Sequence, residues 1–278
     1  MVNYNGQWVD SETLLSNSNR SFLYGDGIFE TLKIVNNKIL FFEDHYFRLM
    51  ASLRIVRMKI PKNFTLEFLE SQILDLAKVN HLSDSARVRL TVFRNDGGFY
   101  LPTSHEVSYL IQISKLDSKA YEIKTTDYEV DLYKDFFVAK QLLSTLKTTN
   151  KMIFVTGSIF ANENGFQNCI VLNNEKNVAE TLHGNLFLVT NNQLITPPIA
   201  EGCLNGIMRK QILKIAKTLH NLEVLEAIIS PFDLQKADEL FVTNIISGIQ
   251  PITKYRKKEY QTQVASQLLI ALNNQINV

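Results

Sequence analysis

The sequence predicts a mixed α/β fold, of the α+β kind, divided into two domains. The chain has 278 residues, which is enough for two domains of ordinary size. Short apolar runs of strand length occur beside segments whose apolar residues recur at helical spacing, and no repeat or low-complexity tract interrupts them. We expect a smaller α+β domain over residues 1–125 and a larger α/β domain over residues 126–278.

The N-terminal part begins with strands and continues with two helices. Asn-Gly at 5–6 and Asn-Asn at 36–37 predict tight turns. Apolar runs flank the second turn, and the apolar residues that follow recur near helical spacing. The predicted elements are strands at 29–34 and 39–42, helices at 44–56 and 66–79, and strands at 88–93 and 107–114.

The C-terminal part alternates short strands with two amphipathic helices. A helix over 152–164 is followed by Gly165 at a C-cap position, and a second helix over 207–219 follows Gly206. The basic run at 254–258 indicates a solvated hairpin turn. The predicted strands span 169–172, 178–181, 186–189, 224–229 and 240–242.

Composition and charge argue against several classes of function. The formal net charge of +1 and the sequence pI near 7.7 do not favour nucleic acid or an anionic membrane as partner, so we expect a small molecule. The sequence shows neither a signal peptide nor an apolar run of ~20 residues, so we expect a cytoplasmic protein. Cys169 and Cys203 are expected to be free packing residues. No histidine pair has metal-ligand spacing, and we expect no metal.

Lys147 is the candidate nucleophile. It lies among apolar residues, just before Asn150 and the predicted helix at 152–164. Desolvation lowers the pKa of an amine and makes its free base available near neutral pH. Most lysines are solvated surface charges, so the assignment of Lys147 as nucleophile depends on the residues that follow it in the sequence.

A carboxylate and a candidate phosphate site follow Lys147 in the sequence. Glu180 ends a predicted strand, and a carboxylate there would keep a pyridine nitrogen protonated, which makes the ring a better electron sink. Gly206 precedes a helix whose first amides can bind an anion. Thr243 and Asn244 end another strand and add polar donors. Taken singly, Glu180 is equally well explained as a solvated acid on an edge strand, and Gly206 as the ordinary start of a helix.

In order, these segments resemble the fold-type IV pyridoxal-phosphate enzymes, the class IV aminotransferase family. The resemblance covers residues 24–251. Its motifs are Tyr24-Gly25-Asp26-Gly27-Ile28-Phe29-Glu30-Thr31, His45-Tyr46-Phe47-Arg48-Leu49, Lys147-Thr148-Thr149-Asn150, Val178-Ala179-Glu180 with Gly184-Asn185-Leu186-Phe187, Leu204-Asn205-Gly206-Ile207-Met208-Arg209, and Thr243-Asn244.

The resemblance implies a two-domain fold like that of D-amino acid aminotransferase, usually a homodimer, with pyridoxal 5′-phosphate (PLP) bound between the domains. It implies that Lys147 is the Schiff-base lysine and moves protons. It also implies that Glu180 pairs with the pyridine nitrogen and that Arg48 binds the phosphate. Further implied cofactor-binding residues are Asn185, Gly206, Ile207, Met208, Thr243 and Asn244. The family usually has threonine where this chain has Met208, so one hydroxyl is lost.

The motifs leave the substrate open. Only two residues separate the lysine from Asn150, which resembles the lyases and D-amino acid transaminases more than the branched-chain enzymes. The loop at 94–100 resembles the lyase loop but has Phe99 where lyases commonly have arginine, and Phe29 replaces the tyrosine of D-amino acid transaminases. The candidate substrate residues are Phe29, Arg94, Phe99 and Tyr100.

Among the reactions of the family we expect that of 4-amino-4-deoxychorismate lyase, which forms 4-aminobenzoate and pyruvate and belongs to folate synthesis. The alternative is a transaminase of a branched-chain or other hydrophobic amino acid that uses 2-oxoglutarate. A third reading is a non-catalytic PLP-binding protein. Formation of 4-aminobenzoate without a keto acid distinguishes the first from the second.

Overall fold

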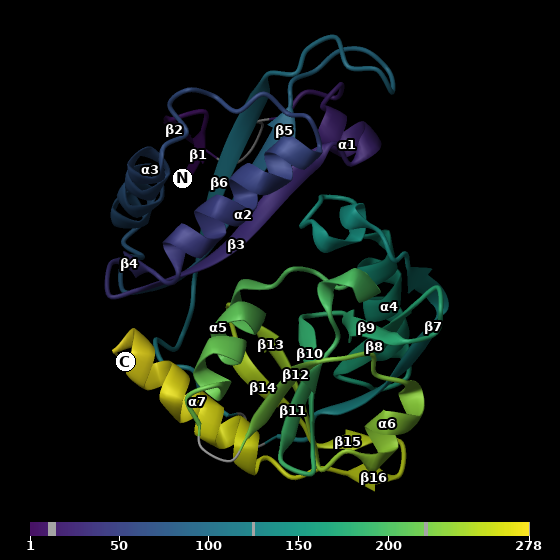
Figure 1. Ribbon diagram of the computed structural model, residues 1–278. Helices are drawn as coiled ribbons and strands as arrows, with labels where there is room; N and C mark the ends of the chain where they lie inside the picture. Colours follow the sequence, from purple (N-terminus) through teal and green to yellow (C-terminus); the bar gives the residue numbers. More distant parts are fainter. Residues whose placement is uncertain (11–14, 124–125, 220–221, 278) are drawn as a thin grey trace. The chain divides into compact units, whose positions relative to one another are not determined.

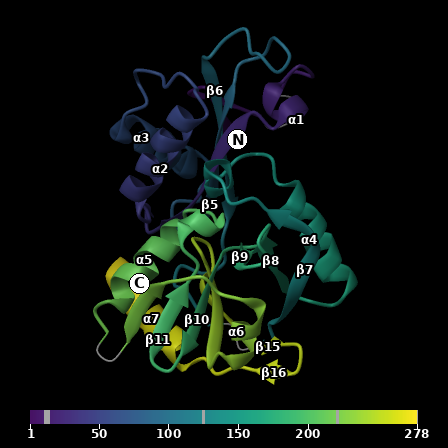
Figure 2. The same cartoon turned by 45° about the vertical axis from the view of Figure 1, so that its right-hand side comes forward.

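The computed structural model describes residues 1–10, 15–123, 126–219 and 222–277. Strands and helices both occur throughout, which confirms the expected mixed α/β class (Figures 1 and 2). The chain divides into two units. The first comprises Met1–Lys119 with Lys147–Asn150, and the second comprises Ala120–Leu146 with Lys151–Val278. The short segment that carries Lys147 therefore belongs to the first unit by its contacts, although it lies within the second unit's sequence.

The first unit is built on a six-stranded antiparallel sheet with the strand order β2-β1-β6-β5-β3-β4. Helix α2 lies along β3 (Figure 1). The strands are β1 (Val2–Tyr4), β2 (Gln7–Val9), β3 (Gly27–Val35), β4 (Lys38–Ile39), β5 (Ser85–Arg94) and β6 (Val107–Lys115). The helices are α1 (Arg20–Tyr24), α2 (Phe42–Ile55) and α3 (Leu66–Val79).

The turns of the first unit follow the sequence prediction, whereas one strand does not. The residues of both predicted turns, at 5–6 and 36–37, have positive φ, as tight hairpin turns require. The strand expected over 39–42 is wrong beyond Ile39, because Phe41 is left-handed (φ 52°) and α2 begins at Phe42. Two acidic residues in the first turn, Glu43 and Asp44, favour a helix start there.

The second unit contains two five-stranded sheets, with the orders β12-β11-β10-β13-β14 and β16-β15-β7-β8-β9. The strands are β7 (Glu129–Val138), β8 (Asn168–Asn173), β9 (Val178–Thr181), β10 (Asn185–Thr190), β11 (Gln193–Thr196), β12 (Glu223–Glu226), β13 (Glu239–Asn244), β14 (Gly248–Ile252), β15 (Lys254–Tyr255) and β16 (Lys258–Glu259). The helices are η1 (Leu142–Thr145), α4 (Met152–Glu163), η2 (Ile199–Glu201), α5 (Ile207–Ala216), α6 (Pro231–Lys236) and α7 (Gln263–Ile276).

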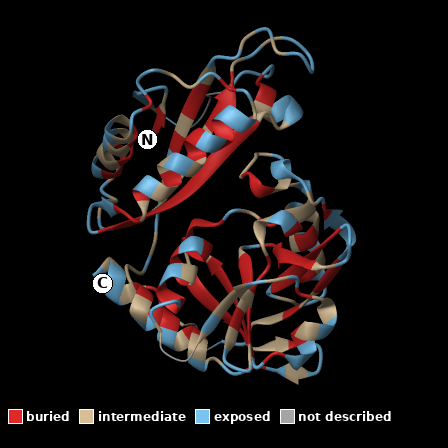
Figure 3. Cartoon of the chain, in the orientation of Figure 1, coloured by how far each residue is buried: buried red, intermediate tan, exposed pale blue. Residues whose placement is uncertain are grey.

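Both sheets of the second unit contribute to one buried apolar core, which includes residues of β7, β8, β10 and β13 (Figure 3). Strands buried on both faces show continuous apolar runs, and this explains why β8, β9 and β10 were recognisable in the sequence. The predicted hairpin at 254–258 is confirmed, with Arg256 at a positive φ. Cys169 and Cys203 are buried free thiols, and burial raises the pKa of Cys169 to about 11 and that of Cys203 to about 12.

Two predicted elements are longer than the observed ones. The helix expected to reach residue 219 ends at Ala216, and the strand expected to reach 229 ends at Glu226. In the described part of the chain, no helix has the length and apolarity needed to cross a membrane. The same part holds no group of three or more histidine, cysteine, aspartate or glutamate side chains arranged to bind a metal ion.

Candidate active site

Lys147 is attached to the edge of the first unit's sheet at the beginning of β3. The Phe29 amide donates to the Lys147 carbonyl at 2.8 Å, and the Thr149 amide donates to the Gly27 carbonyl at 2.9 Å. A Cβ at position 27 would lie 2.7 Å from the Ser21 hydroxyl oxygen, so any larger residue there requires a neighbouring side chain to move. The backbone of a rigid strand therefore fixes the segment that carries the candidate nucleophile.

The Phe29 ring lies against two cations. The Lys147 Nζ is 4.6 Å from the ring centroid, and the Arg89 Cζ is 3.7 Å from it. Both distances are within the range of cation–π attraction. Arg89 is half-buried and also donates from Nε to the Thr91 hydroxyl at 3.2 Å. The structure thus places Phe29, a candidate substrate residue, directly beside Lys147.

Arg48 and His45 of α2 both bind the carboxylate of Glu30 on β3. The Arg48 Nε donates to one oxygen at 2.8 Å and its Nη2 donates to the other, while the His45 Nδ1 lies 2.7 Å from that second oxygen. Burial alone would raise the pKa of Glu30, but the charge of Arg48 and the hydrogen bonds from both partners lower it to about 2. Burial lowers the pKa of His45, while its hydrogen bond to Glu30 acts in the opposite direction. Two N–H groups of Arg48 thus bind Glu30 and fix the guanidinium.

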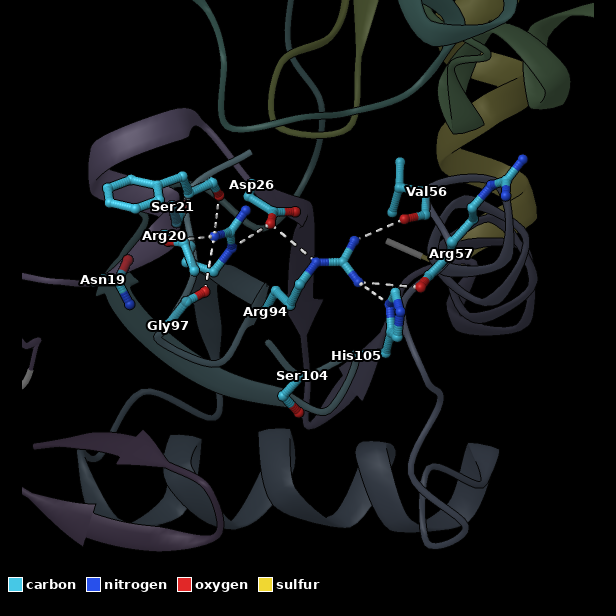
Figure 4. Close-up of polar contacts among 12 residues, drawn as sticks. Asn19, Arg20, Ser21, Asp26, Val56, Arg57, Arg94, Gly97, Ser104 and His105 are labelled. Carbon is cyan, nitrogen blue, oxygen red and sulfur yellow. Dashed lines mark hydrogen bonds and ion pairs between the residues drawn. The ribbon is translucent and has the colours of Figure 1, made fainter. Parts of the chain in front are cut away.

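Arg94, the second candidate substrate residue, is buried and surrounded by protein acceptors (Figure 4). Its Nε donates to the Asp26 carboxylate at 3.0 Å, and its Nη2 donates to the Val56 carbonyl at 2.8 Å. Its Nη1 donates to the Arg57 carbonyl at 3.1 Å and lies 3.0 Å from the His105 Nδ1. These contacts support a structural role for Arg94 and leave little of its guanidinium for a substrate.

Asp26 joins Arg94 to a second arginine, Arg20 of α1 (Figure 4). The Arg20 Nε donates to the same carboxylate oxygen at 2.9 Å, and its Nη1 donates to the carbonyls of Gly97, Gly98 and Phe99 at 3.0, 3.2 and 2.6 Å. The two arginines therefore hold the loop that follows β5. The side chains of Phe99 and Tyr100, the remaining candidate substrate residues, are 82% and 91% exposed at its tip.

In the second unit, Glu180 is a buried carboxylate at the end of β9. One of its oxygens accepts a hydrogen bond from the Leu204 amide at 3.2 Å. The amide of the next residue, Asn205, donates to the Thr145 carbonyl at 3.3 Å. The loop before α5 therefore lies beside both Glu180 and the chain that leads toward Lys147.

Asn185 supports the same loop from β10. Its Nδ2 donates to the Leu204 carbonyl at 2.8 Å, and a Cβ added to Gly206 would lie 2.0 Å from its Oδ1. Glycine is therefore required where α5 begins. No side chain caps α5, so the amides of its first residues, Ile207 and Met208, point out of the helix start without a side-chain acceptor.

Thr243 lies opposite Asn185 in the pairing of β10 with β13. Its hydroxyl is buried and has no hydrogen-bond partner among the described residues. An unsatisfied buried hydroxyl is costly, and a bound ligand is one explanation for its persistence. Asn244 has another role, because its Oδ1 accepts from the amides of Ile246 and Ser247 and its Nδ2 donates to the His183 carbonyl.

The residues of the second unit fit a PLP phosphate and ring. A phosphate needs several donors, and the uncapped start of α5 and the unsatisfied Thr243 hydroxyl supply them. A protonated pyridine nitrogen needs a buried anion, and Glu180 is a buried carboxyl group. The loss of the usual threonine at Met208 removes one hydroxyl, but the backbone amide remains.

The mixed α/β fold and the candidate residues of each unit are those expected of a PLP enzyme of fold type IV. The sequence matches the family described as amino-transferase class IV over residues 27–255, so the chain belongs to that family and is a PLP-dependent enzyme, an aminotransferase or a lyase.

Relatives of this chain carry more than one named activity. A putative branched-chain-amino-acid aminotransferase of Methanocaldococcus jannaschii is 30% identical, over 89% of this chain and 85% of that protein. An aminodeoxychorismate lyase of Vibrio harveyi is 26% identical, over 88% and 90%. The solved branched-chain amino acid aminotransferase of Escherichia coli superposes with a TM-score of 0.88 at 22% identity, over 98% of this chain and 93% of that one, which shows a shared fold. The relatives' names therefore leave the substrate unsettled.

Sequence reasoning missed Arg89 and its neighbour Arg87. A usable signal was present, because both arginines occur two residues apart between Ala86, Val88 and Leu90. Alternation of this kind places both charges on one face of a strand. A charged pair on the same face as a candidate active-site residue is a sign of anion binding.

Proposed function

We propose that the chain is a 4-amino-4-deoxychorismate lyase that forms 4-aminobenzoate and pyruvate. The observation that supports it best is the half-buried Arg89, which lies on the Phe29 ring beside Lys147. Among the described residues, no carboxylate forms an ion pair with Arg89. The guanidinium is thus available to a substrate carboxylate close to the reacting amine.

The same observation argues against a branched-chain side chain at this place. Apolar side chains bind best to apolar surfaces that carry no charge. Here two cations lie close to the Phe29 ring: the Lys147 Nζ is 4.6 Å and the Arg89 Cζ is 3.7 Å from the ring centroid. An anionic, partly conjugated ring such as that of 4-amino-4-deoxychorismate suits an aromatic face flanked by cations.

PLP, when bound, supplies an electron sink for the charge that develops as a substrate C–H bond breaks. The Lys147 amine takes the proton from the carbon that bears the substrate nitrogen and returns a proton to the departing enolpyruvyl group. Glu180 holds the cofactor ring nitrogen in its charged form. We propose that the phosphate is bound by Arg48, Gly206, Ile207, Met208 and Thr243, with Asn185 and Asn244 fixing the loops around it.

Transamination is the second candidate. The Methanocaldococcus jannaschii relative, which is named as a branched-chain aminotransferase, supports it. In that reaction 2-oxoglutarate accepts the amino group, and its carboxylates also suit Arg89. A non-catalytic PLP-binding protein has less support, since Lys147 and Glu180 are both present. The Lys147 carbonyl accepts a hydrogen bond from β3, and the Glu180 carboxylate accepts one from the Leu204 amide.

The test is the purified protein with 4-amino-4-deoxychorismate and no keto acid. We expect 4-aminobenzoate, and we expect Lys147→Ala to lower the rate by at least about 10²-fold, as removal of a general base does. Lys134→Ala, at an exposed position on β7, is the matched control and should keep full activity. A strict requirement for 2-oxoglutarate or pyruvate would favour the transaminase. Cofactor binding without turnover of any amine would favour the non-catalytic PLP-binding protein.

We further propose that the protein is a homodimer, as the family resemblance implies, and that it acts in the cytoplasm. Size-exclusion chromatography with light scattering measures the first property. A single species near 32 kDa, the mass of one chain, would contradict the dimer.

A further inference from the structure

Arg87 and Arg89 project from the same face of β5, because side chains two residues apart in a strand share a face. This is the face of Phe29 and Lys147, since the Arg89 guanidinium lies on the Phe29 ring. Glu30, the next residue of β3, faces α2 on the opposite side, where it binds Arg48. A row of three positions therefore runs away from Lys147 along one sheet face, from Phe29 to Arg89 to Arg87.

The neighbours of this arginine pair do not neutralise it. Across β3, Arg89 lies opposite Thr31 and Arg87 lies opposite Lys33. Across β6 the opposite residues are neutral, namely Gln112 and Ser114. No carboxylate among the described residues forms an ion pair with either arginine. Burial, and then the charge of Arg87, lower the pKa of Arg89, which shows that the two cations repel each other.

Such repulsion costs stability, and Arg87 also lies directly opposite Lys33, an arrangement of like charges that is unfavourable in a sheet. Both side chains are half-buried, so water does not screen the repulsion as fully as it does between surface charges. An anion bound to the pair relieves the cost. Two successive positions on one strand face are about 7 Å apart. One carboxylate cannot form bidentate hydrogen bonds with two arginines at that distance. The spacing suits two carboxylates of one molecule.

We propose that Arg87 is a specificity-determining residue that binds a second carboxylate of the substrate, while Arg89 binds the carboxylate nearer Lys147. The substrate class is therefore an amine or keto acid with two carboxylates. This inference rests on the proposed function, since it assigns Lys147 and Arg89 to the active site. It holds for the lyase reaction, whose substrate has two carboxylates, and for a transaminase that uses a five-carbon dicarboxylic keto acid.

The test is isothermal titration of the PLP-loaded protein with glutarate and with pentanoate, which have the same chain length and differ by one carboxylate. The wild type should bind glutarate more tightly. Arg87→Gln should weaken glutarate binding about 10- to 100-fold, the usual effect of removing a charged hydrogen-bond partner, and leave pentanoate unchanged. Arg89→Gln should weaken both ligands. Arg54→Gln, at an exposed position on α2, is the control and should change neither.

Arg87→Lys serves as a second variant, because lysine keeps the charge but loses the planar fork. It should retain an intermediate preference for glutarate. Unchanged glutarate binding in Arg87→Gln would overturn the proposal, and so would equal loss of glutarate and pentanoate. A loss of bound PLP in Arg87→Gln with the glutarate preference intact would also overturn it and assign the residue to the cofactor. Failure of the proposed function has a different signature, namely a wild type that retains no PLP or does not need Lys147.

Discussion

Arg48 donates from Nε and Nη2 to the two carboxylate oxygens of Glu30, and this ion pair joins helix α2 to strand β3. His45 binds the same carboxylate from one turn earlier in the helix. Glu30 belongs to the first family motif, whereas His45 and Arg48 belong to the second. The pairing gives a physical reason for both motifs, because the buried carboxylate fixes the orientation of the guanidinium that we propose for the phosphate.

The acid stability of the protein should depend on Glu30. The pKa of Glu30 in the folded chain is lowered from 4.5 to about 2. Because the folded-state pKa is the lower one, the ionised group stabilises the protein above pH 4.5, and this contribution is lost as the pH falls toward 2. A shift of this size corresponds to roughly 3 kcal/mol. Glu30→Gln should lower the free energy of unfolding at neutral pH by a similar amount and flatten its dependence on pH between 4.5 and 2.

Denaturant unfolding at a series of pH values measures both effects. Glu106→Gln is the control, because Glu106 is exposed and pairs with the exposed Lys59, and surface pairs contribute little. An acid-unfolding profile of Glu30→Gln that superimposes on the wild type would show that the Arg48 pair does not stabilise the fold.

Reduction of the PLP-loaded protein with borohydride should attach the pyridoxyl group to Lys147. The Lys147 amine is fixed beside Phe29 by the backbone pairing of its segment with β3. Peptide mapping by mass spectrometry identifies the labelled lysine. Lys151 follows four residues later, and its ammonium group lies over the Phe154 ring of α4. Label on Lys151 or Lys140 would contradict the assignment of the nucleophile.

The sequence was informative where a local rule decides the structure. Asn-Gly and Asn-Asn turns, the helix at 66–79 and the apolar strands of the second unit follow from local conformation and burial. Strand β7 was not recognised, because its exposed residues at 134–137 break the apolar pattern. Helix α7 was also missed, since its polar face hides the stripe of Ala265, Leu268 and Leu272.

The site was only partly readable from the sequence, because several contacts join distant residues. Lys147 joins a strand that lies more than a hundred residues before it, and no local pattern predicts that pairing. Arg94 appeared as a substrate residue from its place in a loop motif. Its burial against the carbonyls of Val56 and Arg57 depends on a tertiary contact that the sequence does not reveal.

Replacing Thr243 with valine should have opposite effects on the empty and the PLP-loaded protein. The Thr243 hydroxyl is buried without a partner, so a methyl group of similar size removes an unsatisfied group. We expect the cofactor-free protein to be stabilised by about 1 kcal/mol, whereas PLP affinity falls by about tenfold because a phosphate donor is lost. Thermal unfolding and titration with PLP measure the two quantities.

Thr196→Val is the matched control for this change. Thr196 is equally buried, but its hydroxyl donates to the Leu186 carbonyl at 2.7 Å. Its loss should destabilise the protein with and without the cofactor, by about 1 kcal/mol, and leave PLP affinity unchanged. If Thr243→Val destabilises the cofactor-free protein as Thr196→Val does, the Thr243 hydroxyl has a protein partner and its assignment to the phosphate is wrong.

Asp26→Asn should loosen the loop that carries Phe99 and Tyr100. Asp26 binds both Arg20 and Arg94, and Arg20 holds three successive carbonyls of that loop (Figure 4). An amide keeps the shape but loses the negative charge, so each charge-assisted bond weakens. Backbone amides at 97–103 should exchange with deuterium about tenfold faster, as a loss of about 1.4 kcal/mol in local opening predicts. Asp96→Asn, in the same loop but exposed, keeps a side-chain oxygen for the hydrogen bond from the Ser18 hydroxyl and should leave that rate nearly unchanged. Equal rates in both variants would contradict the clamp.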